Sequence, residues 1–277
     1  MKYFKQLAKA CIGAAAFRSG YYRRFFRDRA VIALFHSIDD RQAGKPITLS
    51  NAAFGQYCAF FRRYFIPVSL EELLERIEAG RDISRRVVIT FDDGYRDNLF
   101  NAAPILERYG LPASFFITTD FIESQIVPPW DREWGVRSEW LSWDEVRELQ
   151  SRGFEIGAHT VTHVNLGCTD GDLAEHEIRE SGRRLSVELD SPVRSFAYPF
   201  GGRDKFSDEN RQRVEQAGYR CCVAGYGGLV APESDRFRLP RVAVTSYDPN
   251  PYHWGYYLLA EHASRRVEPA FAGPIAV

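Results

Sequence analysis

Several features are absent from this 277-residue chain, and each absence narrows the class of protein to which it can belong. Its formal net charge is only -1 at pH 7, so the composition gives no reason to expect nucleic acid as a partner. No apolar run is long enough to cross a bilayer, and no internal repeat or low-complexity linker divides the chain. With 45% hydrophobic and 26% charged residues, the composition is typical of a globular protein with one sizeable core.

Cysteine is scarce and lacks the spacings of a structural site. The five cysteines are odd in number and irregularly spaced, and the sequence contains no C-x-x-C. These facts exclude a disulfide framework and a zinc–cysteine site, so we expect free thiols that are buried or half-buried. Free thiols favour a reducing compartment. The cysteines are Cys11, Cys58, Cys168, Cys221 and Cys222.

The first 29 residues contain lysines, a short apolar run over residues 10–17, and then several arginines and aromatic residues. This pattern fits best with a basic amphipathic helix that lies on a membrane surface. A signal peptide cleaved after residues 14–16 and an ordinary capping helix are the alternatives. We therefore expect a cytoplasmic or membrane-peripheral protein, and a secreted or periplasmic one only if residues 1–16 are a signal.

After residue 30, short apolar runs alternate with helical patterns. Two helices begin with a capping-box pair, Ser69 with Glu72 and Ser142 with Glu145. Predicted helices also end at glycines, as is typical of helix C-termini. The strands are expected at 30–36, 86–91, 114–118, 154–158, 195–199, 221–225 and 238–244, and the helices at 69–80, 97–109, 143–153, 172–189 and before Gly218.

This repeated strand-then-helix order predicts parallel strands joined by right-handed crossovers. Six or seven such units favour an α/β fold of the closed or nearly closed barrel type. An open doubly wound sheet is the alternative, but no glycine-rich phosphate loop follows the first strand. We assign residues 1–29 to the N-terminal helix, residues 30–266 to one barrel domain and residues 267–277 to a loosely held tail.

Residues able to carry chemistry follow several of the predicted strands. In parallel α/β barrels, active-site residues gather at the carboxyl ends of the strands. His36 ends the first strand, residues 92–94 (D-D-G) end another, and His159 ends a third with His163 four residues later. One carboxylate and two imidazoles form a common ligand set for a hydrolytic metal ion. The sequence therefore predicts a metal site at this rim.

The roles of the two adjacent acids can then be separated. If residues 159–163 make a helical turn, both imidazoles lie on one side, and Asp93 can supply the oxygen ligand. Asp92 is left to act as a base, and a divalent cation keeps both acids ionised. Taken alone, D-D-G is more often an Asx-capped turn than a catalytic motif, and H-x-x-x-H is more often a surface pair than a metal site. Their joint occurrence at strand ends favours the metal site.

Several motifs resemble those of one family, the NodB-type polysaccharide deacetylases of carbohydrate esterase family 4. The resemblance covers about residues 30 to 245 and implies a deformed (β/α)7-like barrel. It implies hydrolysis of an N-acetyl, occasionally O-acetyl or N-formyl, group from a sugar. By position, Asp93, His159 and His163 would hold the metal, usually zinc; Asp92 would be the general base, and the Phe200 N–H would hold the oxyanion. The motifs are T-F-D-D-G (90–94), S-F-F-I-T (114–118), G-F-E-I-G-A-H-T (153–160), H-T-V-T-H (159–163) and F-A-Y-P-F-G-G (196–202).

The chain departs from the family pattern at two positions. Where the third motif commonly has a base-orienting arginine, this sequence has Ala197. Arg241 could reach the base from a neighbouring strand instead, or could form only a structural salt bridge. No late L-x-H supplies the general acid, and we expect His253 and His262 to face solvent or to pack. His36 resembles the acid of a permuted, exopolysaccharide-modifying subgroup; the alternative is a packed histidine at a strand end.

Substrate contacts are predicted from aromatic residues. Four of the five tryptophans lie between residues 130 and 143, and sugar rings stack on aromatic faces. We expect Trp130, Trp134 and Tyr198 to bind the glycan, with core packing as the alternative for the tryptophans. The substrate would be an N-acetylated polysaccharide or lipid-linked glycan. Two other functions stay open: a deformylase or amide hydrolase on a small substrate, and a catalytically silent carbohydrate-binding relative, which the intact metal motifs disfavour.

Overall fold

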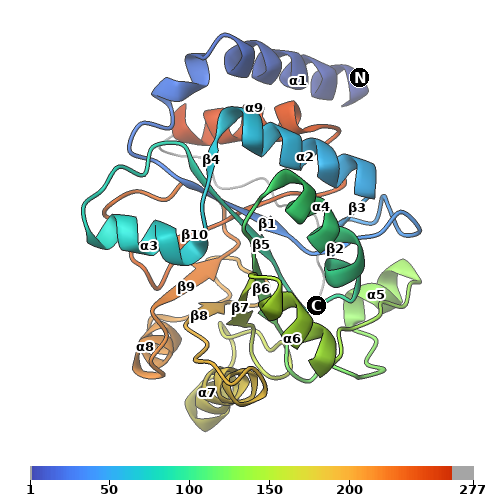
Figure 1. Ribbon diagram of the computed structural model, residues 1–277, viewed down its shortest axis with the longest axis vertical. Coiled ribbons are helices and arrows are strands. Elements are labelled where there is room, and N and C mark those ends of the chain that lie inside the picture. Colours follow the sequence, from blue (N-terminus) through green and yellow to red (C-terminus); the bar gives the residue numbers. More distant parts are fainter. Residues whose placement is uncertain (1, 264–277) are drawn as a thin grey trace.

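Parallel strands and helices alternate along the chain, and the computed structural model describes residues 2–263 of it (Figure 1). The strands form one nine-stranded sheet in the order β10-β9-β8-β7-β6-β5-β1-β11, with β4 beside β5, and every pair is parallel. The strands of this sheet are β1 (Val31–Phe35), β4 (Ile66–Pro67), β5 (Arg86–Phe91), β6 (Ser114–Ile117), β7 (Glu155–Ala158), β8 (Ser195–Ala197), β9 (Cys221–Ala224), β10 (Leu239–Pro240) and β11 (Val242–Ala243). A separate pair joins β2 (Ser37–Ile38) and β3 (Thr48–Leu49).

The barrel is closed by the segment that was predicted as one strand over residues 238–244. That segment is two short strands, β10 and β11, which flank Arg241. Strand β10 pairs with β9 and strand β11 pairs with β1, so the two halves join opposite edges of the sheet. The prediction of a nearly closed parallel barrel is therefore confirmed, and the open doubly wound alternative is wrong.

The helices cover the outside of the sheet (Figure 1). The predicted helix over 97–109 is divided into a π-helical turn, Asn98–Ala102, and a regular helix that ends at Gly110 in the left-handed conformation. Ser142 and Glu145 form the predicted capping box. The α-helices are α1 (Lys2–Arg18), α2 (Asn51–Tyr64), α3 (Leu70–Glu78), α4 (Ala103–Tyr109), α5 (Pro129–Trp134), α6 (Trp143–Ser151), α7 (Gly171–Glu188), α8 (Asp208–Gln216) and α9 (Pro251–Ala263).

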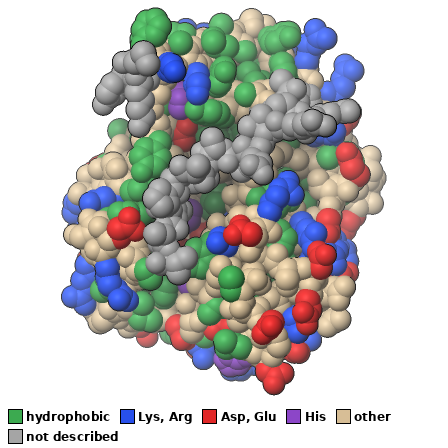
Figure 2. All heavy atoms as spheres, turned by 180° about the vertical axis from the view of Figure 1, so that it is seen from behind, with side chains coloured by type: hydrophobic (Ala, Val, Ile, Leu, Met, Phe, Trp, Pro, Cys, Tyr) green, Lys and Arg blue, Asp and Glu red, His purple; other side chains and the backbone are tan. Residues whose placement is uncertain are grey.

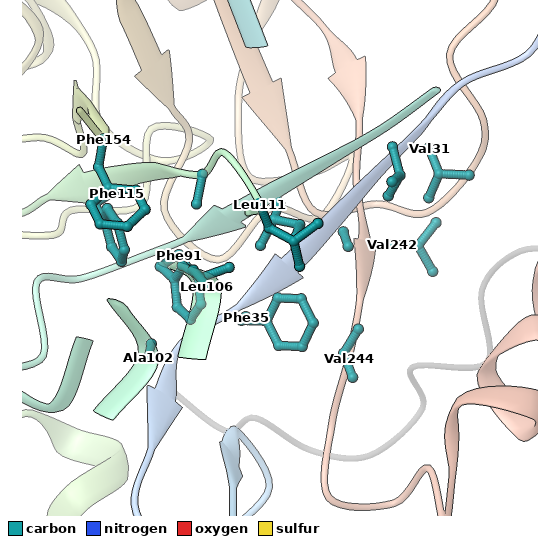
Figure 3. Close-up of a cluster of buried hydrophobic side chains, with 14 of the residues drawn as sticks. Val31, Phe35, Phe91, Ala102, Leu106, Leu111, Phe115, Phe154, Val242 and Val244 are labelled. Atoms are coloured by element: carbon teal, nitrogen blue, oxygen red, sulfur yellow. The ribbon is translucent and has the colours of Figure 1, made fainter. Parts of the chain in front are cut away.

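Alternation along the strands separates two apolar layers. Odd-numbered residues of β1 and β5 point toward the helices, where the rings of Phe35, Phe91 and Phe115 stack across neighbouring strands (Figure 3). Even-numbered residues such as Ile32 and Val88 fill the barrel interior. Because Asp92 continues the even series of β5, its position favours the interior of the barrel rather than the helix layer.

The N-terminal helix lies outside the barrel, against α9 (Figure 1). Contact is close at Gly13, where an added Cβ would lie 2.1 Å from the Tyr252 carbonyl oxygen. None of the helices between residues 2 and 263 is both long and apolar enough to cross a bilayer. All five cysteines are free. The predicted tail over 267–277 and the side chain of His262 lie outside the described part of the chain.

Candidate active site

The D-D-G turn directs two adjacent carboxylates to different places. Asp92 follows the inward-facing Val88 and Thr90 of β5, and it is 3% exposed. Asp93 then takes a positive φ of 78° and Gly94 one of 91°, which turns the chain sharply at the end of the strand. The N–H of Thr118 donates to the Asp93 carbonyl across the neighbouring strand end. The turn thus separates the two side chains although they are neighbours in sequence.

Asp93, His159 and His163 converge, with one potential ligand atom from each lying within 4.8 Å of the others. Oδ1 of Asp93 lies 3.2 Å from Nε2 of His163 and 3.4 Å from Nε2 of His159. Nδ1 of His159 lies 2.8 Å from the Ala197 carbonyl, to which it can only donate, so Nε2 of the neutral ring presents a lone pair. The Asp93 oxygen is buried without a hydrogen-bond partner. An oxygen and two nitrogens arranged in this way fit a divalent cation.

The loop that carries the two histidines is not helical, contrary to the expected helical turn. Thr160 and His163 both have positive φ, at 65° and 62°, and the Thr160 hydroxyl accepts the His163 N–H. This bent conformation, rather than helical spacing, brings the two rings together, with centroids 5.0 Å apart. The loop depends on side-chain hydrogen bonds because it lacks a regular ladder.

Glu177 supplies three of the side-chain hydrogen bonds that hold this loop, and sequence reasoning did not select it. Its carboxylate, on α7, accepts the N–H groups of Val161 and Thr162 at 2.8 and 2.9 Å and the Thr162 hydroxyl at 2.7 Å. The side chain is buried. The available signal was its position within the inward stripe of α7, where Ala174 and Ile178 point to the core. An acid in such a stripe requires polar partners.

Arg241 lies inside the barrel and holds Asp92 with both arms of its guanidinium. Nη1 and Nη2 each donate to one Asp92 carboxylate oxygen at 2.6 Å. Nη1 also contacts the Thr90 hydroxyl at 3.3 Å, and Thr90 in turn donates to the Ala33 carbonyl. The Arg241 side chain is fully buried, so the contact is not a surface salt bridge. Closure of the sheet at β10 and β11 is what delivers this side chain to the end of β5.

The charges around Asp92 determine its protonation. Burial by itself raises the pKa of Asp92, but Arg241 and His159 bring the pKa below its usual value. The pKa of Asp93 is likewise held well below its usual value by His159 and His163, against the effect of burial. Burial lowers the pKa of His159, but the two carboxylates raise it by more, so the net shift of the pKa is upward. Both acids are therefore ionised at neutral pH, in a site rich in donors and cations.

His36 and Phe200 lie beside this cluster. His36 is half-buried at the end of β1, and burial lowers its pKa by more than the charges of Asp93 and Asp92 raise it, so the net shift of the pKa is downward. Its imidazole makes no hydrogen bond to any residue between 2 and 263. Phe200 has a positive φ of 62°, and its ring packs against His163 at 4.7 Å. Within the described residues, nothing accepts a hydrogen bond from the Phe200 N–H, so this donor is available.

The predicted sugar-binding residues have different environments. Tyr198 does not face the site: it is fully buried and stacks on Phe206 at 4.4 Å, so its assignment as a substrate contact is wrong. The alternation of β8 explains the error, because Ala197 faces the barrel interior and Tyr198 faces the helix layer. Trp130 is half-buried at the rim, where its ring meets His163 at 5.0 Å. Trp134 is half-buried at the end of α5.

Two further histidines, His176 and His253, are not part of the cluster. His176 is exposed on α7. His253 is 3% exposed and lies 3.0 Å from Asp248, so it packs as expected. Of the tryptophans, Trp140 is buried against Phe121 and is a core residue.

Comparison with known proteins agrees with this arrangement. The family model described as polysaccharide deacetylase matches residues 79–222, just over half of the chain and including both metal motifs. This chain belongs to the NodB-type polysaccharide deacetylases. The family is one of hydrolases.

Two curated relatives show how far the similarity extends. The Bacillus subtilis protein YxkH is 26% identical over 216 residues, 77% of this chain and 71% of that protein. The poly-beta-1,6-N-acetyl-D-glucosamine N-deacetylase of Staphylococcus epidermidis is 25% identical over 188 residues, 65% of this chain. The match spans 61% of the staphylococcal enzyme, which is less than two thirds of its length.

A solved structure shows the same fold. The Streptococcus pyogenes deacetylase PplD, in complex with acetate, superposes with a TM-score of 0.70 at 21% identity, covering 84% of this chain and 98% of that one. The deacetylase therefore has the nearly closed parallel barrel of its structural neighbours.

Proposed function

We propose that this deacetylase is metal-dependent and removes N-acetyl groups from amino sugars of a polysaccharide or lipid-linked glycan. The observation that carries the proposal is the buried Asp93 oxygen, which lacks a hydrogen-bond donor and faces Nε2 of His159 and of His163 at 3.4 and 3.2 Å. These three side chains would hold the ion, with zinc as the first expectation from the nitrogen-rich donor set. A bound divalent ion supplies Lewis-acid polarisation of the acetyl carbonyl and a lowered pKa for water.

Two residues of the chain would carry out the proton transfers, Asp92 as the base and His36 as the acid. Asp92, ionised and fixed by Arg241, takes one proton from the attacking water, whose oxygen bonds to the acetyl carbon. The N–H of Phe200 donates to the oxyanion that develops on the carbonyl oxygen. As the C–N bond breaks, His36 gives a proton to the leaving nitrogen, so that acetate and a free amine result. Arg241 is a positioning residue because it acts through Asp92.

The sugar would lie at the rim beside Trp130 and Trp134. Trp130 is oriented by a hydrogen bond from its indole N–H to the Tyr95 hydroxyl at 2.9 Å, and it is only half-buried. An aromatic face fixed in this way can stack against a sugar ring. The similarity to an N-deacetylase of poly-N-acetylglucosamine supports an N-acetylglucosamine polymer as the first substrate to test.

The test is acetate release from a panel of N-acetylated glycans and lipid-linked sugars, each with and without a chelator. We expect release from at least one N-acetylglucosamine oligomer, and we expect chelation to abolish it. Formate release from N-formyl sugars, or hydrolysis of small amides alone, would instead favour the deformylase or small-amide hydrolase. Tight glycan binding without turnover in metal-replete protein would favour a silent carbohydrate-binding relative.

We also infer that the deacetylase works at the surface of an anionic membrane, through α1. The outward face of this helix is an uncharged stripe at residues 4, 7, 8, 11, 12 and 15, whereas Ala10 and Phe17 face inward. Phe4, Leu7 and Ile12 are 77%, 62% and 56% exposed. Figures 1 and 2 show α1 as the outermost layer and hydrophobic side chains gathered at that end of the molecule, beside lysines and arginines. Such exposure of large apolar groups marks an interaction surface.

The charge of the N-terminal residues supports an anionic bilayer as the partner of this α1 face. Residues 1–27 contain seven lysines and arginines and no acidic residue. Each basic residue near an anionic lipid surface contributes about 1 kcal/mol, and each buried large apolar side chain about 1.5–3 kcal/mol. The combination fits a bilayer with anionic headgroups better than a second protein.

Sedimentation with vesicles tests the α1 face. The variant Phe4→Ser/Leu7→Ser/Ile12→Ser is expected to lose at least about tenfold in partitioning into phosphatidylglycerol vesicles, since most of the buried apolar area is gone. The matched control, Leu173→Ser/Val187→Ser on α7, removes equally exposed apolar groups and should bind as before. Equal binding by both variants, or a dimer of the natural protein that only the α1 variant loses, would contradict membrane docking.

A further inference from the structure

The three residues that follow β1, His36 to Ile38, are held by polar side chains from the turn after the D-D-G motif. We call residues 36–38 the His36 segment. Nδ2 of Asn98 donates to the His36 carbonyl at 2.7 Å. The Asp97 carboxylate accepts the Ile38 N–H at 2.9 Å and the Ser37 hydroxyl at 2.7 Å. The His36 carbonyl, the Ser37 hydroxyl and the Ile38 N–H are thus all held by Asp97 and Asn98.

The π-helical turn, Asn98–Ala102, gathers these holding groups. It follows Asp97 directly, and its Asn101 donates from Nδ2 to the Ile38 carbonyl at 2.7 Å. Asn98 is 1% exposed and also donates to Asp97 at 2.9 Å, so the two side chains brace each other. Wide turns of this kind are rare and occur frequently at functional sites. None of the three side chains contacts the predicted metal ligands.

We propose that Asn98 and Asp97 are positioning residues that place His36 for proton transfer, an inference that rests on the acid role proposed for His36. The His36 imidazole has no hydrogen-bond partner in the described part of the chain, so no hydrogen bond fixes the orientation of the ring. Its location is therefore set by its own backbone, whose carbonyl is the acceptor of Asn98. An acid displaced by about 1 Å can lose about 10²-fold in rate.

A purely structural role would affect every reaction of the enzyme alike, whereas a positioning role depends on the leaving group. An amine must receive a proton as the C–N bond breaks, so amide hydrolysis needs His36. In 4-nitrophenyl acetate the phenolate leaves as an anion, and its hydrolysis needs no acid. Comparing the two substrates therefore separates placement of the acid from general damage to the site.

The experiment measures kcat/KM on an N-acetylglucosamine oligomer and on 4-nitrophenyl acetate for Asn98→Ala, Asp97→Asn, His36→Ala and Asn98→Ala/His36→Ala. We expect Asn98→Ala to lose about 10- to 100-fold on the oligomer and to stay within about threefold on the ester. Asp97→Asn, which keeps the shape of the side chain, should show a smaller loss of the same kind. The double variant should lose no more than His36→Ala, because Asn98 acts through His36.

Asn210→Ala is the matched control, because Asn210 lies on α8, away from His36, and is also 1% exposed. Its Nδ2 likewise donates to backbone carbonyls, those of Leu166 and Thr169, at 2.7 and 2.6 Å. It should change both substrates equally or not at all. The positioning role would be overturned if Asn98→Ala and Asp97→Asn lost kcat/KM equally on both substrates. It would also be overturned if the double variant lost more kcat/KM than His36→Ala. Either result would leave the acid role of His36 intact. Full amide activity of His36→Ala would instead overturn the acid role itself, and with it this inference.

Discussion

His159→Ala is expected to abolish both metal binding and deacetylation. The variant removes one of the three atoms that converge within 4.8 Å, so an ion would be left with two protein ligands. Metal sites that lose a ligand lose most of their affinity, and the chemistry that the ion supplies goes with it. We expect bound metal, measured by mass spectrometry of the purified protein, to fall from about one equivalent to near zero. Acetate release should fall by more than about 10³-fold.

The metal measurement makes this test independent of activity. His176→Ala is the matched control, because His176 is exposed on α7 and takes no part in the cluster. It should keep full metal content and full activity. If His159→Ala retained one equivalent of tightly bound metal, the assignment of Asp93, His159 and His163 as the ligand set would be wrong, whatever the activity of the variant.

The parts of the site that sequence could indicate are those carried by consecutive residues. Asp92 and Asp93 follow an apolar strand directly, and His159 follows another. Because the carboxyl ends of parallel strands lie at one rim of a barrel, these positions alone predicted that the three residues meet there. The helical-turn expectation for residues 159–163 was wrong because Thr160 and His163 both take positive φ, which a right-handed helix excludes. The loop is also held by Glu177, which lies on a separate helix and accepts the N–H groups of Val161 and Thr162.

Contacts made by chain closure or by register were harder to predict. Arg241 reaches Asp92 because its segment pairs with both edges of the sheet, a fact of three-dimensional topology rather than of local pattern. By contrast, Tyr198 could have been excluded from the substrate site, because strict alternation along the strand from Ala197 places it on the helix side of the sheet. The hydrogen bond from Asn98 to the His36 carbonyl joins residues 62 apart in sequence, and no periodicity indicates it.

Arg241→Met is expected to be the most destabilising substitution in the site. Arg241 and Asp92 are 0% and 3% exposed and share two bonds at 2.6 Å. Removing one partner leaves a buried carboxylate without its counter-charge, which costs about 3–5 kcal/mol of the free energy of unfolding. For a chain of this size, that corresponds to a fall of roughly 10 °C in Tm. Deacetylation should fall as well, because Asp92 is no longer fixed in the position from which it takes a proton from the attacking water.

A double-mutant cycle shows whether the loss comes from the unpaired carboxylate. Asp92→Asn/Arg241→Met removes both charges and should recover a large part of the stability while remaining inactive. Unfolding is measured with a chelator present, so that changes in metal binding do not enter. Arg152→Met is the control, because Arg152 pairs with Glu107 at 2.6 Å on the surface, where about 0–1 kcal/mol is expected. A double variant no more stable than Arg241→Met would show that Arg241 stabilises the barrel through its packing, and not by compensating the charge of Asp92.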